Sequence, residues 1–168
     1  MKKLLLFTIC VALAFSSCKK SSSDIPVNTI SATIDGVDES FNTNPVAELG
    51  TAIRLNSNLI ISGSNGSGTG SDSMAITIES NNTIVKGSYT NGGTNNSDFI
   101  SVLYNKGPLS LAHPAYYTTD VNGTYPTTVT ITSMSSTNIQ GTFSGKLLFT
   151  DGTTVKNVTN GKFNLNIK

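Results

Sequence analysis

The chain contains a single histidine, His113, and this limits the acid–base chemistry that it can perform. Ser110 and Asp120 lie nearby in the sequence, so a Ser-His-Asp triad is the one familiar nucleophilic arrangement available. The Gly-x-Ser-x-Gly turn that exposes the nucleophilic serine of many hydrolases does not accompany them. We therefore predict no catalytic residues, and we keep a hydrolase using His113 only as an alternative.

Oxygen ligands for a metal ion are concentrated in two short segments. Asp35, Asp38 and Glu39 form the first, and Asp120 and Asn122 form the second. Neither segment matches the twelve-residue calcium loop of an EF-hand, and Asp35 is better explained as the first residue of a hairpin turn. A zinc site needs three or four His, Cys or carboxylate ligands, which this sequence does not suggest. The sequence therefore predicts neither a metal site nor a cofactor.

The aromatic side chains suggest a different kind of site. Segment 104–126 holds four of the five tyrosines, three of the five prolines and the histidine. Tyrosine offers a flat apolar face and a hydroxyl group, which suits sugars and peptides at an exposed surface. The alternative, which we favour, is a proline-rich crossover whose tyrosines cover one end of the core. The candidate ligand-binding residues are Tyr104, His113, Tyr116, Tyr117 and Tyr125.

The N-terminal residues predict export. Two lysines are followed by residues 4–15, which are apolar apart from one threonine. This run is shorter than the ~20 residues that cross a bilayer and has the length of a secretory signal. Residues 15–18 (Phe-Ser-Ser-Cys) resemble the lipobox of bacterial lipoproteins, with phenylalanine where leucine is commoner. The resemblance implies cleavage before Cys18 and attachment of fatty acyl chains such as palmitate to this residue.

The cysteine count agrees with that interpretation, because Cys10 would leave with the signal and Cys18 would remain alone. A lone cysteine forms no internal disulfide, whereas several acyl chains on it would hold the protein to a membrane. We expect residues 1–17 to be the signal peptide, 18–28 the lipidated cysteine and a flexible tether, and 29–168 one domain. The expected location is the outer membrane, on its periplasmic face or at the cell surface.

Charge excludes one class of partner. Loss of residues 1–17 leaves nine basic and ten acidic residues. Only 12% of all residues are charged, so we expect no steering toward nucleic acid.

From residue 29 onward, apolar and polar residues alternate in short runs rich in Ile, Val, Phe and Thr, a pattern typical of β-strands. No set of amphipathic helices interrupts the series. The spacing of the runs predicts an all-β fold, either an antiparallel β-sandwich or a flattened β-barrel of about nine to eleven strands. A closed calycin-like barrel is the alternative. The predicted strands cover residues 30–34, 37–43, 52–55, 59–62, 74–79, 84–89, 99–104, 129–131, 139–149, 155–158 and 163–167.

Glycine-containing pairs mark the expected turns. Asp35-Gly36, Asp151-Gly152 and Asn160-Gly161 each separate alternating runs and predict hairpin turns, because Asn, Asp and Gly tolerate a positive φ. Residues 139–149 predict one long strand, or two strands joined by a glycine kink at Gly145.

Four segments, residues 16–20, 32–36, 139–145 and 158–163, carry a likeness to a known group of proteins. Through them the chain resembles the small uncharacterised lipoproteins of Bacteroidetes. The resemblance implies location and fold but no activity, since that family has no established one. Our leading hypothesis is a lipid-anchored outer-membrane β-domain that binds a glycan, peptide or partner protein without catalysis. A structural or adhesive cell-surface lipoprotein is the main alternative.

Overall fold

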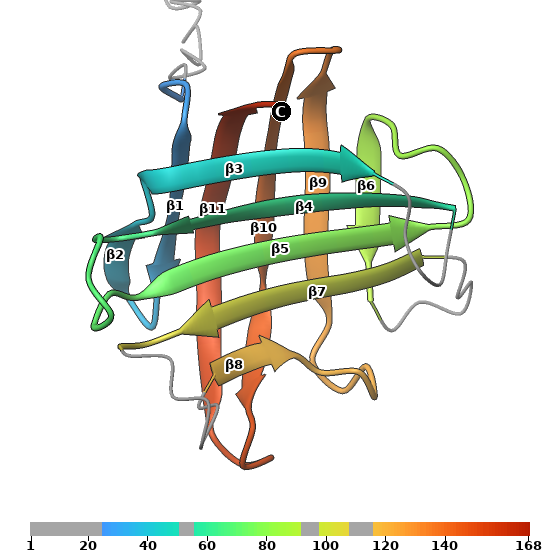
Figure 1. Ribbon diagram of the computed structural model, residues 1–168. Helices are drawn as coiled ribbons and strands as arrows, with labels where there is room; N and C mark the ends of the chain where they lie inside the picture. The colour runs from blue at the N-terminus through green and yellow to red at the C-terminus, as the bar shows by residue number, and fades with distance from the viewer. Residues whose placement is uncertain (1–24, 51–55, 92–97, 108–115) are drawn as a thin grey trace, which may run out of the picture.

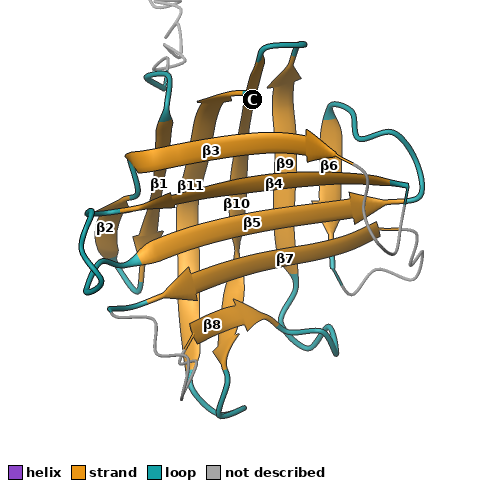
Figure 2. Cartoon of the chain, in the orientation of Figure 1, coloured by secondary structure: helices purple, strands orange, loops and turns teal. Residues whose placement is uncertain are grey.

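A computed structural model describes residues 25–50, 56–91, 98–107 and 116–168 of the chain. These residues form antiparallel strands and loops, and no helix occurs among them (Figure 2). The prediction of an all-β fold with nine to eleven strands is confirmed: eleven strands form one strongly curled sheet. Cys18, His113, Ser110 and the predicted strand 52–55 lie outside the described residues.

The curled sheet has two layers that cross steeply, and we call them the front sheet and the back sheet (Figure 1). Such crossed layers leave a core between their inner faces. The front sheet contains, in spatial order, β8 (Tyr116–Thr119), β7 (Asp98–Asn105), β5 (Ser73–Ser80), β4 (Ser57–Ser64) and β3 (Thr43–Gly50). The back sheet contains β2 (Val37–Ser40), β1 (Thr29–Ile34), β11 (Val155–Asn166), β10 (Asn138–Phe149), β9 (Thr127–Met134) and β6 (Gly87–Thr90).

The two layers are joined by β10, which bends at Gly145. Before the bend β10 pairs with β9, and from Leu147 onward it pairs with β8. Gly145 has a φ of 155°, and a Cβ there would lie 2.6 Å from Thr127 Oγ1. Only glycine fits this corner without displacing β9. Of the two predicted alternatives, one long strand is the one observed, and it bends at Gly145.

The core follows the alternation that the sequence predicts. Every second residue of β1 and β5 is buried, as is every second residue of β7 from Ile100 to Tyr104, and the interior is dominated by isoleucine. The largest buried aromatic side chains are Phe41, Tyr104 and Phe163.

Among the described strands, β2 and β3 end the hydrogen-bonded path and are not paired with each other. A single bridge between Ala47 and Ile167 links β3 to the chain end beyond β11. The architecture is therefore a half-open, curled sheet, consistent with a sandwich or open barrel rather than with a closed calycin-like barrel.

The turn predictions have different outcomes. Asp35 and Gly36 have φ values of 49° and 83° and form the β1–β2 hairpin turn, as predicted. Residues 151–152 also lie in a turn, between β10 and β11. The prediction of a hairpin at Asn160-Gly161 is wrong, because both residues lie inside the continuous strand β11.

Asn160 instead forms a β-bulge. Its φ is 53°, and the register shifts beside it in the pairings of β11 with both β1 and β10. Asparagine accepts this left-handed conformation, which explains why the same residue pair resembles a turn signal in the sequence.

Candidate functional site

The structure separates the candidate tyrosines into different environments. Tyr104 on β7 is buried, and its ring makes an edge contact with Phe41 at 6.1 Å between centroids. The Tyr104 ring also stacks with Tyr117 on β8, at 6.1 Å between centroids. Tyr117 in turn contacts Phe149 at 4.8 Å. Four aromatic rings thus form a row that closes the core where β8 and β10 meet.

The Tyr104 hydroxyl is fixed by an acid. It donates a hydrogen bond to Asp72 Oδ2 at 3.0 Å, while the Gly107 N–H donates to Asp72 Oδ1 at 2.7 Å. Burial, together with this bond to Asp72, raises the pKa of Tyr104 above its ordinary value. The phenol therefore stays protonated and ties the β4–β5 loop to the end of β7.

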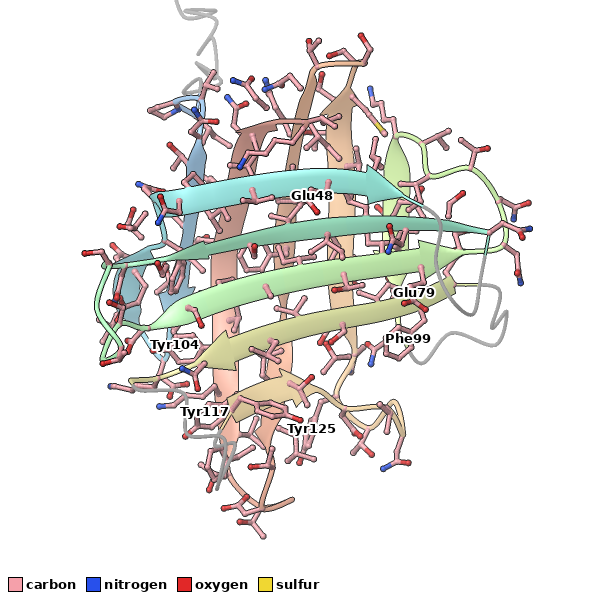
Figure 3. All side chains as sticks on the ribbon, viewed as in Figure 1. Glu48, Glu79, Phe99, Tyr104, Tyr117 and Tyr125 are labelled. Atoms are coloured by element: carbon pink, nitrogen blue, oxygen red, sulfur yellow. The ribbon has the colours of Figure 1, made fainter. Side chains whose placement is uncertain are left out.

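The other two described candidates, Tyr116 and Tyr125, lie apart from the pair of Tyr104 and Tyr117. Tyr116 neighbours Tyr117 on β8, so the alternation of a strand places it on the outer face, beside Asn105 of β7. Tyr125 is half-buried, and Lys146 Nζ lies 5.7 Å from its ring centroid. Figure 3 labels Tyr104, Tyr117 and Tyr125. The structure brings Tyr104 and Tyr117 together and leaves Tyr116 on another surface.

Three of the acids considered as metal ligands or as a triad member, Asp35, Asp38 and Asp120, have structural partners. Asp120 accepts hydrogen bonds from the backbone N–H groups of Asn122 and Thr124, both at 2.9 Å. These bonds, first of all the one from Asn122, lower the pKa of Asp120. Asp35 binds Lys156 Nζ at 2.6 Å. In the ranges that the structure describes, no three His, Cys, Asp or Glu side chains are grouped as metal ligands would be.

A polar depression lies on β1, β2 and β11, and we call it the bulge hollow. Its volume is about 480 Å³, within the usual range for small-molecule sites. The Asn160 bulge lies at its wall, and bulges bend the strand that carries them. The residues lining the bulge hollow are Ser31, Ala32, Thr33, Asp38, Glu39, Ser40, Asn160 and Lys162.

Strand pairing places the polar groups of the bulge hollow on one face. Ser31 of β1 is paired with Ser40 of β2 on one side and with Lys162 of β11 on the other. Thr33, two residues further along β1, is paired with Asp38 of β2. Since residues two apart share a face, these side chains all project from the outer face of the back sheet.

Hydrogen bonds hold part of this arrangement in place. Thr33 Oγ1 donates to Asp38 Oδ1 at 2.7 Å, and Asn160 Nδ2 lies 3.4 Å from Thr33 Oγ1. Lys162 is half-buried, and it forms no ion pair with any described residue. The bulge hollow therefore presents a carboxylate, an ammonium group, an amide and several hydroxyls, which together can donate and accept many hydrogen bonds.

The outer face of the back sheet continues this hydroxyl-rich character beyond the bulge hollow. Lys162 is paired with Thr142 on β10, which is paired with Thr130 on β9, and Thr130 with Ser88 on β6. The hydroxyls of Ser88 and Thr130 are 2.9 Å apart. One row across the sheet thus consists almost entirely of hydroxyl side chains.

Sequence reasoning did not identify the bulge hollow. Of the lining residues, only Asp38 and Glu39 were considered as metal ligands. The spacing of Asn160 and Lys162 indicates no functional role. The usable signal is the Asn160-Gly161 pair inside an alternating run, which marks a bulge as well as a hairpin.

Comparison with known proteins yields no match to any family model, curated protein or solved structure. In the described ranges, no helix has the length and apolar character needed to cross a membrane.

Proposed function

We propose that this protein is a lipid-anchored domain of the outer membrane that binds a glycan in the bulge hollow, without catalysis. The observation that carries the proposal is the convergence of Asp38, Asn160 and Lys162 with serine and threonine hydroxyls in one depression. A sugar presents several hydroxyls at once, each able to donate and accept. A site with a carboxylate, an amide and an ammonium group complements them.

The anchoring part of the proposal rests on the lipobox resemblance at Cys18 and on the polar tether that follows. An acylated cysteine would place the domain close to the membrane surface, where envelope glycans are concentrated. Expression of the full chain with Cys18→Ser tests this part. We expect the substituted protein to lose incorporation of labelled palmitate and to leave the membrane fraction; retention of both would contradict lipidation at Cys18.

The binding part is tested with residues 18–168 carrying Cys18→Ser, which keep all eleven strands and cannot be acylated. A glycan array identifies ligands, and titration calorimetry measures their affinities. Asp38→Asn and Lys162→Gln should each weaken binding about tenfold, since hydrogen bonds to charged groups contribute ~1.5–3 kcal/mol.

Glu48→Gln is the matched control, because it removes one negative charge from the opposite outer face, on β3 (Figure 3). Its affinity for the glycan should equal that of the unsubstituted protein. Equal losses in Glu48→Gln and Asp38→Asn would show that net charge, rather than the bulge hollow, governs binding.

A further inference from the structure

The outer face of the front sheet differs in chemistry from the hydroxyl-rich outer face of the back sheet. Ile60 on β4 and Phe99 on β7 project from it and are 37% and 44% exposed. Ala75 and Leu103, which are paired with each other across β5 and β7, lie half-buried on the same face. In a chain so rich in serine and threonine, these apolar side chains stand out as a contact surface. We call this surface the front face.

The charged side chains of the front face are all negative. Glu48 and Glu79 are the only charged residues that project outward from the described parts of β3, β4, β5 and β7. Neither forms an ion pair with a described residue. Each glutamate is paired across the sheet with an exposed apolar residue, Glu48 with Ile60 and Glu79 with Phe99. Figure 3 shows Glu48 on β3, and Glu79 and Phe99 toward one end of β5 and β7.

The spacing of the two carboxylates limits which partner could pair with both of them. They lie two strands apart and are offset by two residues, because Thr77, two residues before Glu79, is paired with Ile60, the partner of Glu48. With strands ~4.8 Å apart and ~3.3 Å per residue, the two positions are ~12 Å apart. In an extended chain, side chains at positions i and i+4 lie on one face, ~13 Å apart.

The geometry points to the front face as a docking surface for an extended, basic segment of a partner protein. Two cationic side chains of the segment, four residues apart, pair with Glu48 and Glu79. An apolar side chain between them packs against Ile60, while Phe99, beyond Glu79 on β7, packs against the aliphatic stem of the cationic side chain that pairs with Glu79. A second copy of this chain fits less well, because face-to-face contact would oppose like charges. This site is independent of the glycan site, which lies on the other sheet.

The probe is a synthetic peptide with the repeat Lys-Thr-Val-Thr-Lys-Thr-Val-Thr-Lys, and the matched control replaces every lysine with glutamate. Binding to residues 18–168 with Cys18→Ser is followed by amide chemical shifts at low ionic strength. We expect the lysine peptide to shift resonances of β3, β4, β5 and β7, and the glutamate peptide to shift none. High salt should weaken binding, since surface charge pairs are screened.

Variants separate charge from apolar contact. Glu48→Gln with Glu79→Gln should weaken peptide binding about fivefold, the effect of two exposed charge pairs. Phe99→Ser should weaken it without changing its salt dependence. Asp38→Asn, which removes one negative charge from the back sheet, is the control and should leave the affinity for the peptide unchanged. Thermal unfolding of each variant verifies that the fold is retained.

Three results would overturn the inference. The first is equal binding of both peptides, or binding of neither. The second is a set of shifts confined to the back sheet. The third is self-association of the protein in sedimentation experiments that Glu48→Gln with Glu79→Gln abolishes, which would make a second copy the occupant. Loss of glycan binding in Asp38→Asn with intact peptide binding would leave this inference standing, so the two proposals fail separately.

Discussion

Gly161 of β11 is paired with Phe143 of β10, and the missing side chain of Gly161 leaves the space that the Phe143 ring and backbone occupy. A Cβ at residue 161 would lie 2.7 Å from the ring carbons Cγ and Cδ2. The glycine is therefore required for close approach of the two strands beside the bulge. Its φ is not positive, so the requirement does not come from a turn conformation.

Gly161→Val should destabilise the protein by ~1–3 kcal/mol or more, because overpacking here forces two long central strands apart. Gly87→Val is the control: Gly87 lies on edge strand β6, has open space where a Cβ would project, and should change stability by less than ~0.5 kcal/mol. Urea denaturation of the two variants measures the difference. Equal effects would contradict the close-approach explanation.

Phe163 lies in the core on β11 and is fully buried. Phe163→Ala should cost ~3–5 kcal/mol of the free energy of unfolding, the range for a large buried side chain that leaves a cavity. Phe99→Ala removes the same ring from an exposed position and should cost far less. Chemical denaturation gives both values, and a cost below ~1 kcal/mol for Phe163→Ala would place that residue outside the core.

The adjacent tyrosines of β8 should respond differently to truncation. Tyr117 packs between Tyr104 and Phe149, with Lys156 Nζ 5.6 Å from its ring centroid. Tyr117→Ala should therefore cost ~2 kcal/mol or more, whereas Tyr116→Ala, on the outer face, should cost clearly less. Thermal unfolding compares them directly. A larger loss for Tyr116→Ala would show that the two rings have exchanged faces.

The ion pair between Asp35 and Lys156 should contribute to acid sensitivity. The hydrogen bond from Lys156, and then that from the Asn157 N–H, lowers the pKa of Asp35 below its ordinary value. A lowered pKa in the folded state stabilises the protein above the unfolded pKa of ~3.9. That stabilisation is lost as the pH falls through the lower, folded value.

Asp35→Asn should therefore show a shallower fall in stability below pH ~4 than the unsubstituted protein. The difference should not exceed ~1 kcal/mol, because both side chains are partly exposed to solvent. Urea denaturation across the acid range provides the comparison. Parallel pH profiles for the two proteins would contradict a role for this pair.

Local alternation made most of the fold predictable, and its absence explains what was missed. β5 buries every second residue, so its residues identify it without knowledge of its neighbours. β3 contains Pro45 and an Asn44 of φ 48°, and only Ala47 on it is fully buried, so no periodicity marks it. β8 has four residues, of which only Thr119 is buried, and tertiary pairing with β7 and β10 defines it as a strand.

The bulge hollow was less predictable for a related reason. Its side chains come from the β1–β2 hairpin and from β11, near the other end of the sequence, and only the pairing register brings Asp38 and Lys162 to one face. The Asn160-Gly161 signal is real but has two structural meanings. A hairpin and a bulge both use the left-handed conformation of asparagine, and local sequence does not distinguish them.

The most direct test of the proposed function is an amide chemical-shift map of residues 18–168 with Cys18→Ser, titrated with the strongest ligand from the glycan array. We predict that the largest shifts fall on Ser31, Thr33, Asp38, Asn160 and Lys162, the lining of the bulge hollow. Shifts that cluster instead around Tyr116 and the front face, or that are absent at saturating glycan, would contradict glycan binding in the bulge hollow.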